Sequence, residues 1–149
     1  MRFRYTPLRA KAPVVTLGGR QERPRPIAHV TLIGPTGSRA IDGGLDSHAD
    51  DTVFPERYAV LTGVDLTNAP TGTAAGIGQA PVPVKYAQVT LRLTDGKEFR
   101  EWIGRVGFTP VLTDYALLGF AGCLQFFTAT FYGDHEEVEL IVNGLYPGT

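Results

Sequence analysis

Cysteine and long hydrophobic segments are scarce in this chain of 149 residues. Its single cysteine, Cys123, has no second cysteine in the chain to pair with, which argues against a bridged, secreted scaffold and favours a reducing, cytoplasmic location. The most apolar run, residues 115–124, is too short to cross a bilayer, and no apolar stretch of signal-peptide length follows the basic N-terminus. We therefore expect a soluble protein with no membrane partner.

Internal repeats and low-complexity tracts are also missing, and the length suits one domain. Glycine and proline together are too frequent for a helical bundle, with 18 Gly and 11 Pro, whereas 43% apolar residues are enough for a core. Disorder and a coiled coil are therefore disfavoured.

Charge is balanced overall but divided unevenly along the chain. Residues 1–40 hold eight bases and one acid, and the remainder holds six bases and fourteen acids. We interpret residues 1–27 as a basic, Pro-rich N-terminal arm and residues 28–149 as the folded domain, because the prolines of the arm exclude a central strand. A solvated arm that docks on the acidic body of its own chain is favoured over a nucleic-acid binder, since few aromatic rings accompany the bases.

Alternating apolar residues predict three hairpins, over residues 27–45, 82–103 and 127–142. The alternation changes phase close to Tyr86, which indicates a bulge or a sharp twist there. Residues 68–81 are rich in Gly, Ala and Thr and are expected to form a mobile loop or hairpin tip.

One short helix is expected over residues 55–63, with Pro55 at its start and Gly63 at its stop. Periodicity does not assign residues 117–124 to a strand or a helix. The pattern as a whole predicts an all-β domain with one or two short helices.

Chemically useful side chains gather at a junction between a predicted strand and a loop, where the sequence reads Leu-Asp-Ser-His-Ala-Asp-Asp-Thr-Val-Phe-Pro over residues 45–55. This stretch resembles the retropepsin-like aspartic proteases, whose signature is Asp-Thr/Ser-Gly-Ala-Asp followed by apolar residues. In this chain, His48 stands where the family has glycine. Two further segments match in order and spacing: Gly76-Ile77-Gly78 is similar to the flap, and residues 117–119 are similar to the apolar-apolar-Gly triplet that braces the catalytic loop.

The resemblance covers about residues 28–143 and implies a retropepsin-like acid protease barrel that acts as a C2 homodimer on a peptide or protein substrate, with no metal or cofactor. Two carboxylates that share one proton let one act as base on water while the other polarises the peptide carbonyl. Because the chain has one such motif, Asp46 of each copy would meet its twin at the axis.

The family also implies a role for the neighbouring residues. Ser47 would lock the two catalytic loops together, His48, Ala49 and Asp50 would contact substrate, and Gly76, Ile77 and Gly78 would close over it. His48 would project into the cleft, lie against Asp46 and favour a doubly ionised dyad, or narrow the substrate pocket after the loop relaxes.

Other interpretations of the motif remain open. A chain that keeps the fold without turnover would be a dimerisation or binding module. Independently of the family, the residues from Asp46 to Asp51 are of types common as turn formers and helix caps. A metal-dependent hydrolase is a third interpretation, because Asp46-x-His48-x-Asp50 and the segment 133–136 contain ligand types.

Cys123 and the aromatic residues are better explained by packing than by chemistry. Cys123 has the size of a small buried hydrophobe. The aromatic side chains that we expect in the core or in a dimer interface are Trp102, Phe126, Phe127 and Phe131.

Overall fold

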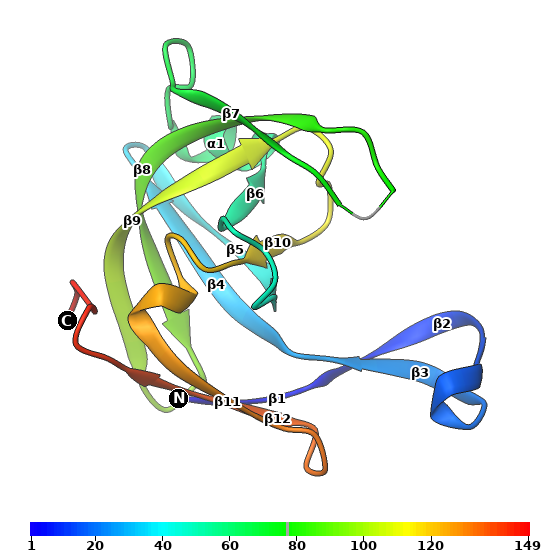
Figure 1. Cartoon of the computed structure of the whole chain (residues 1–149). Helices are drawn as coiled ribbons and strands as arrows, with labels where there is room; N and C mark the ends of the chain where they lie inside the picture. The colour runs from blue at the N-terminus through cyan, green and yellow to red at the C-terminus, as the bar shows by residue number, and fades with distance from the viewer. Residues whose placement is uncertain (77) are drawn as a thin grey trace.

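The computed structural model describes residues 1–76 and 78–149 of the chain. Six strands close a barrel (Figure 1). They are hydrogen-bonded in the order β4 (Ile27–Gly34), β5 (Gly37–Leu45), β10 (Ala116–Leu118), β6 (Val53–Pro55), β9 (Phe99–Thr109) and β8 (Val82–Thr94), and β8 pairs with β4. Strand β7 (Thr71–Ala74) extends the sheet beyond β8.

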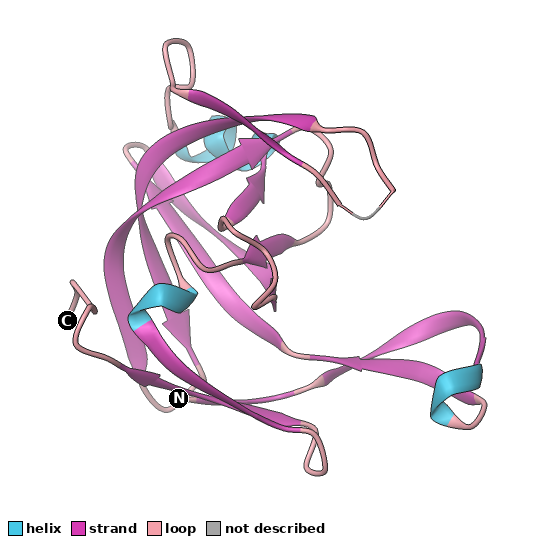
Figure 2. Ribbon diagram, in the orientation of Figure 1, coloured by secondary structure: helices cyan, strands magenta, loops and turns pink. Residues whose placement is uncertain are grey.

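Two smaller sheets lie outside the barrel. The first contains β1 (Arg2–Arg4), β12 (Glu137–Val142) and β11 (Phe127–Tyr132), in that order. The second is a ribbon of β2 (Thr6–Val14) and β3 (Arg20–Arg25), which carries the 3-10 turn η1 (Val15–Leu17) at its far end and extends away from the barrel (Figure 2).

The helices of the described residues are few and short: α1 (Glu56–Thr62), η1 and a second 3-10 turn, η2 (Leu124–Phe126). The all-β class with a short helix is thus confirmed. None of these helices is long and apolar enough to span a membrane.

The local patterns explain these elements. Pro55 stands directly before α1 without a side-chain capping bond, and Gly63 ends the helix at a φ of 74°, in the left-handed region that glycine adopts at little cost. All three predicted hairpins are present as β4–β5, β8–β9 and β11–β12. Residues 117–124, which periodicity left unassigned, divide between the end of β10, the connection that follows it and the first residue of η2.

Of the bulge or sharp twist expected near Tyr86, the bulge is absent, because β8 pairs with β9 from Lys85 to Thr94 without a change of register. Instead, β8 is one long, strongly curved strand (Figure 1). Buried side chains change phase along it from Val84 to Val89, since the first part lies beside β7 and the second part faces the barrel interior.

The core fills the barrel and reaches the outer three-stranded sheet. Trp102 is buried at its centre and donates its indole N–H to the Gly122 carbonyl over 2.9 Å. Phe126, Phe127 and Tyr146 pack edge-on or tilted around this ring. The packing roles predicted for Trp102, Phe126, Phe127 and Cys123 are confirmed, whereas Phe131 is exposed.

Candidate functional site

The candidate site is the loop that joins β5 to β6. Strand β10 inserts between these two strands and runs parallel to β5, with Leu118 opposite Leu45. Both residues are buried, and the backbone N–H of Asp46 donates to the Leu118 carbonyl over 3.2 Å. Asp46 therefore lies at the point where a buried strand opens into the loop.

Backbone hydrogen bonds hold this loop against the segment that follows β10. The N–H of Phe120 donates to the Ala49 carbonyl over 2.9 Å, and that of Ala121 donates to the Asp50 carbonyl over 2.8 Å. Thr52, which is fully buried, donates its hydroxyl to the Gly119 carbonyl over 3.3 Å. The loop is thus fixed by main-chain partners far away in the sequence.

Gly119 is required for this close approach. A Cβ at this position would lie 2.7 Å from the carbonyl oxygen of Ala49 and closer still to that of Asp51. Real Cβ atoms do not approach backbone oxygens at such distances. The glycine of the predicted brace therefore lets two chain segments touch, which is a packing reason for its presence.

Asp46 receives a local hydrogen bond as well. The backbone N–H of His48 donates to Asp46 Oδ1 over 2.9 Å, and the N–H of Ala49 donates to the Asp46 carbonyl over 3.2 Å. This turn orients the carboxylate of Asp46, which is partly exposed. A carboxylate held at a strand end and open on one side is suited to act on water.

His48 fits this turn without backbone strain. Among the described residues, Glu136 is the only non-glycine with a positive φ, so His48 needs no conformation that glycine alone favours. Its side chain is exposed, and no carboxylate of the described chain lies within 4.0 Å of its ring nitrogens. Within one copy of the chain, the imidazole does not lie against Asp46.

A tyrosine that the sequence interpretation did not single out for the site joins this loop to β8. The Tyr86 hydroxyl donates to Asp51 Oδ2 over 2.8 Å. Burial and then the hydrogen bond to Asp51 raise the pKa of Tyr86 to about 12. A Cβ on Gly72 of β7 would lie 2.9 Å from Cε2 of the Tyr86 ring, so the ring packs closely against this glycine. The one signal in the sequence was the change of phase at Tyr86.

The remaining predicted site residues lie in the β5–β6 loop and in the connection between β7 and β8. Ser47 and Asp50 are exposed, and their side chains make no hydrogen bond to the described part of the chain. Gly76 and Gly78 are exposed in the connection between β7 and β8, which projects from the barrel in Figure 1. Ile77 lies outside the described residues. The roles of all these residues in substrate binding stay predictions.

Metal ligands do not gather in the described residues. No group of three or more His, Cys, Asp or Glu side chains there is arranged to hold a metal ion. The second segment that suggested ligands, residues 133–136, forms the turn between β11 and β12.

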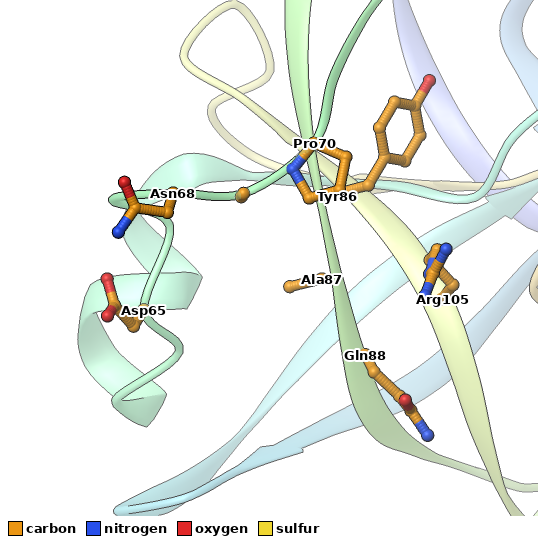
Figure 3. A pocket seen from close by; sticks show the side chains of 8 residues that line it. Asp65, Asn68, Pro70, Tyr86, Ala87, Gln88 and Arg105 are labelled. Carbon is orange, nitrogen blue, oxygen red and sulfur yellow. The ribbon is translucent and has the colours of Figure 1, made fainter.

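A separate cavity opens on the outer side of β8 and has a volume of about 330 Å3 (Figure 3). Asp65, Asn68 and Pro70 from the connection between α1 and β7 line one part of it. Gln88 of β8 and Arg105 of β9 line the other. Residues 46–50 do not line this cavity, whereas Tyr86, which donates to Asp51, does.

Comparison with known proteins finds similarity among solved structures. No protein-family model matches the chain. No curated protein matches it in sequence. Among solved structures, the retroviral protease-like domain of Ddi1 from Leishmania major is similar over 83% of this chain and 94% of that domain, with 11% sequence identity and a TM-score of 0.46.

Proposed function

We propose that this chain is a retropepsin-like aspartic endopeptidase that works as a homodimer. The observation that carries the proposal is the placement of Asp46 at the open end of β5, in a loop clamped by residues 118–121. The sequence motif around Asp46 and the bracing glycine, Gly119, support the same assignment.

Two copies are needed because one chain supplies a single motif carboxylate. In the proposed dimer, Asp46 of one copy is ionised and removes a proton from water, whose oxygen attacks the peptide carbonyl carbon. Asp46 of the other copy is protonated and donates its proton to the carbonyl oxygen. The tetrahedral intermediate then breaks its C–N bond. The leaving nitrogen takes the proton that water gave up, and one hydroxyl of the intermediate returns a proton to the Asp46 that donated one.

Residues near Asp46 have supporting roles in this proposal. Ser47 and Asp50 present free polar groups on the exposed side of the loop, where a partner loop and a peptide backbone would meet them. The β7–β8 connection, with Gly76 and Gly78, would cover a bound peptide. Tyr86 holds the Asp51 end of the loop to β8, the strand that leads to this cover.

The two candidate functions differ in the effect that His48 has on cleavage. Its exposed side chain stands two residues from Asp46, and a twofold axis would place two imidazoles beside the shared cleft. This departure from the family motif is the reason to keep a second candidate function, a dimerisation or binding module that has the fold without cleavage.

Peptide cleavage tests the proposal. The purified chain should cut peptides from a mixed library at acidic pH, and a statine inhibitor of the pepstatin type should block the cleavage. Asp46→Asn should abolish it, whereas Asp134→Asn, a change in the exposed β11–β12 turn, should leave it intact. Cleavage that persists in Asp46→Asn would refute the proposed mechanism.

Replacing His48 by glycine separates the two candidates. Cleavage that appears only in His48→Gly would show that the natural chain is a binding module with a disabled site. Loss of an existing cleavage would assign His48 a role in the active enzyme. A chain that cuts no peptide in either form, and that is dimeric, would support the binding module.

A further inference from the structure

The cavity shown in Figure 3 lies where the sheet beside β8 is interrupted. The pairing of β7 with β8 ends at Lys85, and the pairing of β4 with β8 begins at Thr90. Residues 87–89 of β8 therefore have β9 on one edge and no strand on the other among the described residues. Ala87 and Gln88 line the cavity, which has a volume of about 330 Å3. The cavity thus opens at an edge of the sheet that no strand covers.

Gln88 presents its backbone groups to this gap. The N–H of Tyr86 donates to the Pro70 carbonyl over 2.8 Å, so the backbone groups of Tyr86 point away from β9. Alternate residues of an antiparallel strand direct their N–H and C=O to the same edge. Gln88, two residues further on, therefore directs one donor and one acceptor into the gap. A ligand with peptide groups can take the place of the missing strand.

One wall of the cavity is cationic. Arg105 of β9 stands directly opposite Gln88, so the two side chains share one side of the sheet. Both side chains are exposed and line the cavity. Among the described residues, the Arg105 guanidinium has no partner in an ion pair or a hydrogen bond. Because a guanidinium can bind a carboxylate through two parallel hydrogen bonds, this wall suits a carboxylate.

Another wall of the cavity is acidic. It belongs to the connection between α1 and β7, from which Asp65 and Asn68 line the cavity. The Thr67 hydroxyl and backbone N–H lower the pKa of Asp65, so this carboxylate is ionised at neutral pH. Asp65 and Arg105 form no ion pair with each other, which places their charged atoms more than 4.0 Å apart. The cavity therefore holds two opposite charges that do not neutralise each other directly.

Apolar surface accompanies the two charged walls. Ala69, Pro70 and Ala87 line the cavity, and Figure 3 shows Pro70 and Ala87 between Asp65 and Arg105 in this view. Small-molecule sites commonly combine an apolar lining with a few polar groups that fix the orientation of the ligand. The small apolar side chains here leave room for a ligand that reaches from one charge to the other.

We propose that this cavity binds a short peptide with free termini. The peptide carboxylate would pair with Arg105, the peptide ammonium with Asp65, and an amide group with the backbone of Gln88. An inorganic anion would be repelled by Asp65, and a simple cation would be repelled by Arg105. Residues 46–50 do not line the cavity, so the proposed peptide site and the proposed active site can be tested separately.

Titration with trialanine tests the site in the natural chain. In heteronuclear NMR spectra of the 15N-labelled protein, the backbone amides of Ala69, Ala87 and Gln88 should shift, with a dissociation constant of about 1–10 mM. N-acetylation of trialanine should weaken binding about fivefold, and amidation of its carboxylate should do the same, because each removes one exposed ion pair. Free alanine, which has no peptide bond, should also bind about fivefold more weakly.

Two substitutions assign the two ends of the ligand. Arg105→Gln should weaken trialanine binding about fivefold, yet it should leave the affinity for the amidated peptide as it is in the natural chain. Asp65→Asn should weaken trialanine equally and leave the affinity for the N-acetylated peptide unchanged. Arg23→Gln and Asp134→Asn are matched controls at exposed positions outside the cavity lining. Both controls should keep the affinity for trialanine within about twofold.

The outcomes separate this site from the proposed active site. No amide shift in the cavity at about 50 mM trialanine would overturn the proposal. Equal binding of trialanine, its blocked forms and free alanine would overturn the assigned ligand. Shifts at residues 46–50 that Arg105→Gln and Asp65→Asn leave unchanged would place the peptide at the Asp46 loop instead. Cleavage and its loss in Asp46→Asn are measured independently, so failure of either proposal leaves the other standing.

Discussion

Gly119→Ala tests whether the close contact between the β5–β6 loop and the segment after β10 stabilises the protein. The added Cβ would stand 2.7 Å from the Ala49 carbonyl oxygen, where ordinary contacts begin at about 3.4 Å, so the segments must separate by several tenths of an ångström or more. That movement weakens the two hydrogen bonds from Phe120 and Ala121, which measure 2.9 Å and 2.8 Å.

The expected loss follows from these contacts. Two buried backbone hydrogen bonds contribute about 1 kcal/mol each, and overpacking adds about 1–3 kcal/mol. Gly119→Ala should therefore lower the free energy of unfolding by roughly 3–5 kcal/mol, on adding these contributions. Urea denaturation followed by tryptophan fluorescence measures this change, because Trp102 is the only tryptophan and is buried.

Gly133→Ala is the matched control for this substitution. A Cβ on Gly133 would meet no atom within 4 Å, and its φ is not positive. This variant should therefore remain within about 1 kcal/mol of the natural stability. A loss below about 1 kcal/mol in Gly119→Ala, with the control unchanged, would refute the inferred role of the close contact.

Further predictions concern three single side chains. Tyr86→Phe removes the hydrogen bond to Asp51 and should lower the free energy of unfolding by about 1.5 kcal/mol in urea, whereas an unchanged midpoint would contradict the link. In the natural chain, the raised pKa of Tyr86 means that its stabilisation is complete below about pH 10 and is lost as pH rises towards 12, which thermal melts at alkaline pH would detect. Burial raises the pKa of Cys123 to about 12, so a thiol reagent at pH 8 should label it only in urea, and rapid labelling of the folded chain would disprove its burial. Desolvation opposes ionisation of Asp95, but hydrogen bonds from backbone N–H groups, including those of Glu98 and Arg2, outweigh it and lower the pKa of Asp95 to about 2. The stability that this carboxylate contributes should therefore be complete above about pH 4 and be lost as pH falls towards 2. Asp95→Asn should reduce that loss in thermal melts at acidic pH.

Local chemistry made part of the fold predictable from sequence. The helix was found because Pro55 and Gly63 mark its two ends, and the hairpins were found because turn residues separate alternating strands. The phase change at Tyr86 was visible, but its cause was not. The strand passes from the β7 side into the barrel interior, so different neighbours cover its two halves, and no bulge is needed.

Long-range pairing limited what the sequence predicted of the candidate site. The motif around Asp46 and the bracing Gly119 were both identified, yet the hydrogen bond between Tyr86 and Asp51 joins residues 35 positions apart. No spacing rule predicts such a contact. The assignment of residues 117–124 had the same limit, because β10 is a strand only through its pairing with β5 and β6.

The insertion of β10 between β5 and β6 has a consequence for synthesis of the protein. Asp46 and its loop leave the ribosome long before residues 118–121, which supply their backbone partners. Until those later residues emerge, the loop lacks the hydrogen bonds that shape it, and contacts so distant in sequence form slowly. The order of translation thus delays the final shape of the loop that carries Asp46 until residues 118–121 have been made.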